Sequence, residues 1–272
     1  MDIKKLINPE VFKEVERFAE NYDSSIPYPH IVIDDFFNED IAIYLASNFP
    51  RLEDMPYIFK EPMSYKGQLS DISDKWPKFL SIFDVLQSDC FRGLISRITS
   101  IHNLIQDPIL AGGGLHQSPR SGFLDIHIDA NFHPIDKSLH RRVNLIIYVS
   151  QKWDSNWGGN LEIWSDLDGR PNNLIHSIEP KFNRAVIFST TKSSWHGVTP
   201  IVCPDGQSRK SIALYYYTNS RPETELYEDS SVIWMSKRSV FKKMFYPLLN
   251  YSIKKLKPYS KYIPRNVFDA KR

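Results

Sequence analysis

Two histidines and one aspartate carry the strongest chemical signal in this sequence. His127 and Asp129 are separated by one residue in an apolar segment, and His196 follows about seventy residues later. On a β-strand, side chains two residues apart project from the same face, so His127 and Asp129 are expected to point toward one spot. Two imidazoles and one carboxylate form the facial ligand set of non-haem Fe(II), which leaves half of the octahedral positions open. The three residues therefore predict a catalytic metal site.

A positively charged residue follows the last of these histidines. After His196 the sequence has an apolar segment, a Pro-Asp-Gly turn at 204–206 and a further segment that contains Arg209. This pattern predicts two adjacent antiparallel strands joined by the turn, with Arg209 on the strand next to His196. A guanidinium there can bind a carboxylate through two parallel charge-assisted hydrogen bonds. We therefore expect an anion-binding arginine beside the metal.

The order of the motifs resembles that of one enzyme family. The chain is similar to the prolyl-4-hydroxylase-like family of Fe(II)- and 2-oxoglutarate-dependent oxygenases, and the resemblance extends over roughly residues 108 to 218. A set of motifs in the right order is far more specific than any one of them. In chain order these motifs are His127-x-Asp129, residues 142–148, 157–163, 183–188 and 195–198, and Arg209-x-Ser211.

The resemblance implies a fold and a domain organisation. The family folds as a double-stranded β-helix, a jelly roll of two facing sheets with the iron inside one end. We therefore expect a mainly β protein with flanking helices and a cupin-like jelly-roll core at 108–220. N-terminal helices and a leading strand (1–107) should pack on this core, and a basic, helical C-terminal extension (221–272) should follow. The three parts are expected to form one structural domain.

The resemblance also implies cofactors and roles for individual residues. Fe(II) is held by His127, Asp129 and His196, 2-oxoglutarate is the co-substrate, and ascorbate serves as a reductant. The co-substrate is decarboxylated to succinate and CO2, and dioxygen supplies the hydroxyl group. Related halogenases have a small residue in place of the carboxylate ligand, so Asp129 favours hydroxylation. The residues expected around 2-oxoglutarate are Arg209 and Tyr148, which would bind its distal carboxylate, together with Asn144, Ser211 and Gln117.

Other residues and other functions compete with this assignment. His116, His133 and His140 lack a carboxylate two residues away together with a matching later histidine, and Arg184 precedes the last histidine, an order that the family pattern disfavours. A cupin-like metalloenzyme would use the triad without 2-oxoglutarate. A non-catalytic jelly-roll module would instead bind carbohydrate, through tryptophans such as Trp153, Trp157, Trp164 and Trp195.

The elements before the metal motif are expected to position the core. Asn8 and Pro9 predict the start of a helix, and apolar residues at helical spacing follow to residue 22. A strand that leads into a second helix is expected from residue 28, and residues 91–105 carry one continuous apolar helical stripe. Residues 51–75 contain Pro, Gly, Ser and Asp, which predict a long loop or lid over the mouth of the jelly roll.

Length and composition indicate an ordinary globular protein. The 272 residues, of which 42% are hydrophobic and 24% charged, suffice for one large β domain with additions and a substantial core. Cys90 and Cys203 are the only cysteines, which excludes a disulfide framework and a Cys-rich zinc site. The N-terminus lacks the apolar segment of a signal peptide, and no run is long enough to span a bilayer. We therefore expect a cytoplasmic protein.

The C-terminal tail from Met235 is strongly basic. It contains eleven Lys or Arg residues against Asp269 alone, whereas the whole chain has a net charge of +2. Aromatic and aliphatic residues between these charges are compatible with helices that have an apolar face. The tail is expected to pack on its own domain, and the alternatives are contact with an anionic lipid or glycan surface and contact with nucleic acid.

The substrate is the least constrained feature. Residues expected on the open side of the metal come from the 51–75 loop and from residues 117–121 and 130–140, together with Trp195. The candidate substrate residues, Arg120, Asn131 and Trp195, together with His133 and Arg141 make this lining polar and basic. A polar or anionic acceptor is therefore favoured over a hydrocarbon, in the form of a peptidyl residue such as proline, an amino acid derivative or a sugar.

Overall fold

The computed structural model describes residues 1–73, 75–226 and 231–235, and the predicted basic extension beyond residue 235 lies outside the described residues. The helices are α1 Ile3–Leu6, α2 Pro9–Lys13, α3 Val15–Ser24, α4 Glu39–Ser47, α5 Pro77–Leu86 and α6 Asp89–Thr99. The strands are β1 His30–Ile33, β2 Tyr57–Glu61, β3 Ser64–Leu69, β4 Gly114–Pro119, β5 Phe123–Ile128, β6 His140–Tyr148, β7 Leu161–Leu167, β8 Arg170–Ile178, β9 Ala185–Ser189, β10 Trp195–Val198, β11 Ser208–Thr218 and β12 Ile233–Trp234. Within this described part, no helix has both the length and the apolar character needed to cross a membrane.

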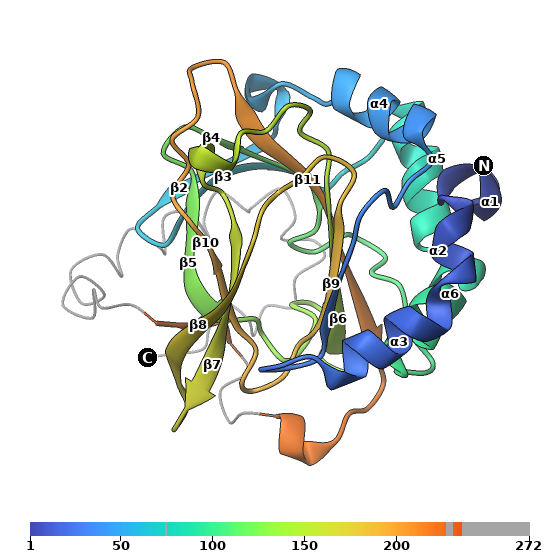
Figure 1. Cartoon of the computed structure of the whole chain (residues 1–272), viewed down its shortest axis with the longest axis vertical. Coiled ribbons are helices and arrows are strands. Elements are labelled where there is room, and N and C mark those ends of the chain that lie inside the picture. Colours follow the sequence, from blue (N-terminus) through green and yellow to red (C-terminus); the bar gives the residue numbers. More distant parts are fainter. Residues whose placement is uncertain (74, 227–230, 236–272) are drawn as a thin grey trace.

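The strands form two facing antiparallel layers. In hydrogen-bonded order one layer is β1-β9-β6-β11-β4 and the other is β5-β10-β7-β8, and β3 joins the two because it pairs with both β4 and β5. Figure 1 views the molecule with β6, β9 and β11 on the helix side and with β5, β10, β7 and β8 opposite. The prediction of a mainly β protein with a jelly-roll core and flanking helices is confirmed.

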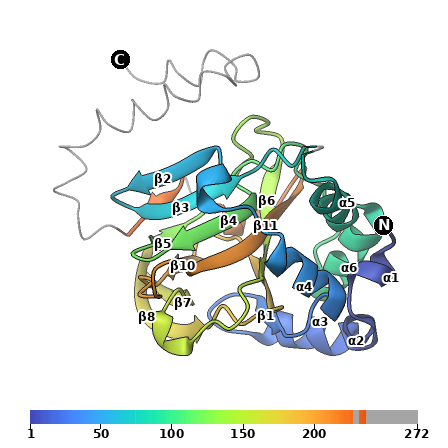
Figure 2. The same cartoon turned by 90° about the horizontal axis from the view of Figure 1, so that it is seen from above.

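The helices lie on the outer side of the layer that contains β6, β9 and β11 (Figures 1 and 2). Asn8 caps α2 because its side-chain oxygen accepts a hydrogen bond of 3.0 Å from the backbone N–H of Glu10, and Pro9 occupies the first helical turn. The helix that was expected to run to residue 22 is divided into α2 and α3 at Glu14, which has non-helical dihedral angles.

The two faces of the helix-side layer pack in different surroundings. In β9, Ala185 and Ile187 belong to the large apolar core between this layer and the helices. Val186 and Phe188, which alternate with them, belong to a smaller cluster between the two layers together with Tyr148. The interior between the layers is therefore only partly filled by apolar side chains, and it is there that the polar residues of the site lie.

The expectation of a loop or lid at 51–75 is wrong for most of the segment. β2 and β3 form an antiparallel hairpin, with Tyr57 opposite Gln68 and Glu61 opposite Ser64. The sequence of β3 looks like a loop because its buried positions include Ser64 and Gln68, which are normally surface residues. Gly67 packs closely there, since a Cβ would come within 2.4 Å of the Leu52 side chain and that side chain would have to move.

The expected helical stripe at 91–105 ends early. α6 stops at Thr99, and Ser100 has a left-handed φ of 57°, which terminates the helix. Ile105 instead forms an isolated β-bridge with Tyr217. Neither α5 nor β8 was expected from the sequence. β8 has mostly exposed or half-buried residues, so it lacks the alternation that marks a half-buried strand.

The expected pairing of the strand of His196 with that of Arg209 is also wrong. β10 pairs with β5 and β7, whereas β11 pairs with β4 and β6. The connection after β10 contains the predicted turn, but it crosses from one layer to the other instead of closing a hairpin. Arg209 therefore enters the site from the layer opposite to His196.

Candidate metal centre

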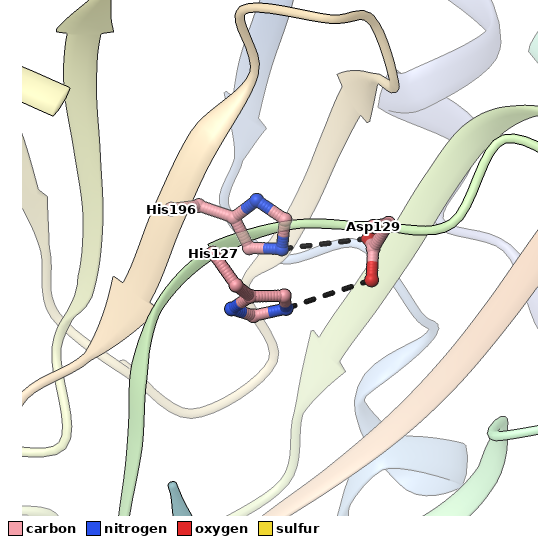
Figure 3. A group of neighbouring side chains, drawn as sticks. All are labelled: His127, Asp129 and His196. Carbon is pink, nitrogen blue, oxygen red and sulfur yellow. Dashed lines mark ion pairs between the residues drawn. The ribbon is translucent and has the colours of Figure 1, made fainter. Parts of the chain in front are cut away.

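His127, Asp129 and His196 converge at one end of the space between the layers (Figure 3). His127 on β5 is directly opposite His196 on β10, and Asp129 lies just beyond the end of β5. The Nε2 atoms of the two histidines each lie 3.5 Å from a carboxylate oxygen of Asp129. One potential ligand atom from each residue lies within 4.8 Å of the others, and all three residues are buried. In the described part of the chain this is the one cluster of His, Cys, Asp and Glu with such spacing.

Backbone carbonyls set the tautomer of both imidazoles. The Nδ1 atom of His127 lies 2.8 Å from the carbonyl oxygen of Asp125, and that of His196 lies 2.9 Å from the carbonyl oxygen of Ser194. A carbonyl oxygen only accepts hydrogen bonds, so Nδ1 carries the proton in each ring. The Nε2 lone pairs therefore point toward the centre of the cluster, as metal ligation requires.

The carboxylate of Asp129 is oriented by two residues of β6. Asn144 donates a hydrogen bond of 2.7 Å to Oδ2, and a guanidinium nitrogen of Arg141 lies 3.1 Å from the same oxygen. Burial raises the pKa of Asp129, but the neighbouring charge of Arg141 outweighs it and holds this pKa well below its usual range. Burial, together with the neighbouring His127, lowers the pKa of His196 to about 4. Near neutral pH the cluster thus offers one anionic oxygen ligand and a neutral imidazole.

A β-bulge in β5 changes which side chains face the site. His196 pairs with His127 and Val198 pairs with Leu124, so β5 has one residue more than β10 over this stretch. Simple alternation would place Leu124 and His127 on opposite faces, yet both line the pocket. Gly197 permits the tight approach of the two strands, since a Cβ would lie 3.1 Å from the Leu124 carbonyl oxygen.

Arg209 forms the opposite wall of the site. Its side chain is buried, and one guanidinium nitrogen donates a hydrogen bond of 3.2 Å to the hydroxyl of Tyr148, over whose ring the guanidinium also lies. Among the described residues it has no carboxylate partner, and its Nε atom has no hydrogen-bond acceptor. A buried guanidinium without a counter-ion is expected to bind an anionic ligand.

The pocket between these walls has a volume of about 630 Å³ including its open mouth. Of the predicted site residues it is lined by the three metal-ligand candidates and by Asn144, Arg209 and Ser211. Seven apolar side chains also line the pocket. These are Phe123, Leu124, Ile146, Leu161, Phe188, Val198 and Ala213.

Five predicted residues lie outside this lining. Tyr148 is buried behind Arg209, and Gln117 donates a hydrogen bond of 2.7 Å to Ser208. The indole N–H of Trp195 donates to Asp166 at 2.7 Å, on the side of β7. Arg120 contacts the Cys203 carbonyl, and the carbonyl of Asn131 accepts the backbone N–H of Arg141.

The competing residues have other partners. The His133 imidazole lies 3.3 Å from Asp107, and its Nδ1 accepts the backbone N–H of Asp136. Arg184 forms a bidentate ion pair with Asp34. His116 lines the pocket, but burial and the nearby Lys66 charge hold its pKa well below the usual range, and its Nε2 hydrogen-bonds the Gly112 carbonyl.

Several residues near the site were assigned no role from the sequence. Lys66 and Tyr215 line the pocket, and Trp234 of β12 stacks on His127 with ring centres 4.8 Å apart. The alternation expected for β6 placed Arg142 on the face of Asn144. A β-bulge opposite Tyr216 and Tyr217 instead turns Arg141 inward, where its guanidinium lies over the Tyr215 ring. Arg142 is paired with Glu225. No local sequence signal marks such a bulge.

The part of the sequence that forms this site matches a known family model. Residues 113–217 match the sequence model described as the 2OG-Fe(II) oxygenase superfamily. This range contains all three residues of the cluster and Arg209, so the matched motif and the observed site coincide.

Two curated relatives match about two hundred residues of the chain. The prolyl 3-hydroxylase OGFOD1 of Xenopus laevis is 27% identical over 201 residues, which are 71% of this chain and 35% of that protein. The Mus musculus protein of the same name is 25% identical over 202 residues, with 73% and 34% covered. The chain thus spans about a third of the length of these relatives.

The fold is also similar to that of solved structures. A prolyl 4-hydroxylase structure from Phytophthora capsici superposes with a TM-score of 0.50 at 18% sequence identity, and the match covers 80% of this chain and 67% of that one. At this identity the likeness concerns the fold alone.

Proposed function

Because residues 113–217 match the model of the 2OG-Fe(II) oxygenase superfamily, we propose that the chain hydroxylates a peptidyl prolyl residue with dioxygen and 2-oxoglutarate, releasing succinate and CO2. The observation that supports this most is the pairing of two features in one pocket. A buried His-Asp-His cluster lies on one layer, and a buried guanidinium without a carboxylate partner among the described residues lies on the other.

The donor set fits Fe(II). His127 and His196 would bind the metal through Nε2, and Asp129 would bind it through a carboxylate oxygen. The metal and its 2-oxo acid supply the oxidising chemistry when they are bound. The protein supplies the position of the ligands: the Asp125 and Ser194 carbonyls fix the rings, and residues of β6 fix the carboxylate.

The opposite wall fits 2-oxoglutarate. Arg209 would take the distal carboxylate in a charge-assisted interaction, with the Tyr148 hydroxyl as a second donor and the Ser211 hydroxyl beside them. The apolar residues of the lining would exclude water from the reacting carbon. Asn144 would act through Asp129, since its amide already holds that carboxylate.

A prolyl substrate is proposed from two observations. Both curated relatives are named as prolyl hydroxylases, and the pocket combines an apolar wall with polar groups at the metal. A pyrrolidine ring is compatible with such a wall, whereas a sugar would leave its hydroxyls facing Leu124, Phe188 and Val198 without partners.

We also propose a cellular compartment, a reductant and a domain organisation for the enzyme. Cys90 and Cys203 are free thiols, which is compatible with a reducing compartment such as the cytoplasm. Ascorbate is proposed as the reductant that maintains Fe(II). The N-terminal helices, the jelly-roll core and the C-terminal extension are proposed to act as one domain, with the basic extension available for an anionic surface.

The test is incubation of the protein with Fe(II), 2-oxoglutarate and a pool of proline-containing peptides. The expected result is a mass increase of one oxygen on proline together with an equal amount of succinate. The His196→Ala variant should give neither product. Succinate formed only with free amino acids or sugar conjugates would contradict the prolyl assignment, and absence of any succinate would contradict an oxygenase function.

A further inference from the structure

Lys66 is a cation inside the pocket that has no counter-ion among the described residues. It lies on β3, the strand that joins the two layers, and it lines the same pocket as His127 and His196. No carboxylate of the described chain pairs with its ammonium group, whose Nζ lies 5.9 Å from the centre of the Phe59 ring. Lys66 is half-buried, and charges that are partly withdrawn from water in proteins are usually paired, so this lysine requires an explanation.

The described residues that line the pocket carry an excess of positive charge. Lys66, Arg141 and Arg209 are cationic, whereas Asp129 is the one acidic residue of this lining. Fe(II) carries two positive charges and 2-oxoglutarate carries two negative ones, so loading the pocket leaves its net charge unchanged. The excess of positive charge therefore persists when both are bound.

Of the three cations Lys66, Arg141 and Arg209, Lys66 is the one for which no anionic partner has been assigned. Arg141 forms an ion pair of 3.1 Å with Asp129, and Arg209 is assigned to the distal carboxylate of 2-oxoglutarate. Burial lowers the pKa of Lys66 to about 8, and the charges of Arg141 and Arg209 act in the same direction against the pull of Asp129. A bound anion would remove this electrostatic cost.

Lys66 lies on the side of the pocket where we expect the substrate to bind. The residue before it, Tyr65, pairs with Phe123 of the metal-bearing strand β5, and the residue after it, Gly67, pairs with Gln117 of β4. Lys66 thus lies between the strand of His127 and the wall of Arg209, beside the apolar residues that would contact a pyrrolidine ring.

We propose that Lys66 is a specificity residue that binds a carboxylate of the acceptor, so that the preferred substrate is a prolyl peptide with an Asp or Glu close to the target proline. This inference rests on the proposed function and specifies its substrate class. Since an extended chain advances about 3.3 Å per residue, the acidic residue lies within about two positions of the proline. A compact ammonium with three donors suits a single carboxylate.

The experiment compares proline peptides that differ only in one neighbouring residue, which is Glu, Gln or Lys. Binding is measured with Mn(II) in place of Fe(II) and with 2-oxoglutarate present, so that affinity is read without turnover, and hydroxylation is measured separately with Fe(II). Wild-type protein should bind the Glu peptide at least about tenfold more tightly than the Gln peptide, as expected for a charged hydrogen bond. The Lys peptide should bind most weakly.

Variants of the β2–β3 hairpin test whether Lys66 causes the preference for the Glu peptide. Lys66→Gln should bring the Glu and Gln peptides to equal affinity, and Lys66→Arg should retain the preference. Lys60→Gln is the matched control, because Lys60 is an exposed lysine of the neighbouring strand β2. Thermal unfolding checks that each variant is folded. A Glu preference that survives in Lys66→Gln, or equal binding of both peptides in the wild type, would overturn the proposal. So would a loss of 2-oxoglutarate affinity in Lys66→Gln without any change in peptide preference.

A second probe separates this inference from the proposed function. If no proline peptide is hydroxylated, the prolyl function fails, and the lysine is then tested with N-acetylglutamate methylamide against its glutamine counterpart in the Mn(II) protein with 2-oxoglutarate. Tighter binding of the acid that depends on Lys66 would support a carboxylate site. Equal binding of the two would overturn it.

Discussion

The two faces of the layer that contains β6, β9 and β11 have different roles. On the helix side, Leu145, Ile187 and Leu214 belong to a large core that is apolar throughout. On the side that faces the second layer, the same strands present Asn144 and Arg209 next to Phe188. The helix side contributes burial of apolar surface, which stabilises the fold, while the inner side keeps charged groups out of water at a cost in stability. Substitutions on the two faces should therefore have different consequences.

The largest expected effect is the loss of a metal ligand. His196→Ala removes one of three donors, so Fe(II) binding and 2-oxoglutarate turnover should fall to background while thermal unfolding stays close to that of the parent. Metal content after dialysis and succinate formation are the measurements. His176→Ala, at an exposed histidine of β8 outside the cluster, is the control and should keep both. Retention of turnover by His196→Ala would remove His196 from the ligand set.

Removal of the buried guanidinium is expected to weaken co-substrate binding. Arg209→Ala removes the counter-ion proposed for the distal carboxylate, which should cost about 2 to 5 kcal/mol of 2-oxoglutarate affinity. The dissociation constant is read by titration in the presence of Mn(II). Lys210→Ala provides the matched control, because Lys210 is the neighbouring residue and does not line the pocket. Equal effects of the two substitutions would contradict a specific role for Arg209.

On the helix side the expected effect is on stability alone. Leu145 is fully buried in the large core, so Leu145→Ala should lower the free energy of unfolding by about 2 to 5 kcal/mol. The affinity of the folded protein for metal and 2-oxoglutarate should be unchanged. Chemical denaturation measures the first quantity and titration at low temperature the second. A variant that unfolds normally but has lost its co-substrate affinity would show that the two faces are coupled.

The smallest expected effect is a pH-dependent cost of the charged Lys66. Its folded pKa of about 8 lies below the ordinary value of 10.5, so the unfolded chain binds more protons between these two values. The contribution of Lys66 to stability should therefore rise as pH increases from about 8 to 10.5. Relative to Lys66→Met, the wild type should be less stable at pH 7, and this difference should shrink over that window. A difference that is independent of pH would contradict the burial of a charged lysine.

Local sequence patterns were sufficient to predict the candidate metal ligands. His127 and Asp129 were predicted to meet because side chains two apart share a face of a strand, whereas the jelly-roll fold was implied by the family resemblance that the motifs carry. Arg209 was predicted beside the metal for a wrong reason, namely pairing of its strand with that of His196. The long-range pairing of β11 with β4 and β6 depends on tertiary contacts that no local pattern encodes.

Two features of the site were not predicted from the sequence, for two physical reasons. Arg141 was expected on the open side of the metal, but its ion pair with Asp129 was not, because it depends on a β-bulge that shifts the alternation of β6 by one position. Lys66 and Gln68 occupy a strand whose inward positions are polar because the interior there is a binding pocket, and a polar strand resembles a loop in sequence. Hydrophobic alternation identifies strands that bury apolar surface, so it fails at the site itself.

Anaerobic titration of the protein with Fe(II) and 2-oxoglutarate shows whether the cluster of His127, Asp129 and His196 and the guanidinium of Arg209 form one site that binds iron together with the 2-oxo acid. We expect a visible charge-transfer absorption that requires both additions, saturates at one iron per chain, disappears in His196→Ala and needs much more 2-oxoglutarate in Arg209→Ala. Binding of Fe(II) without any such absorption at saturating 2-oxoglutarate would contradict it, since a metal site of another kind would then occupy this jelly roll.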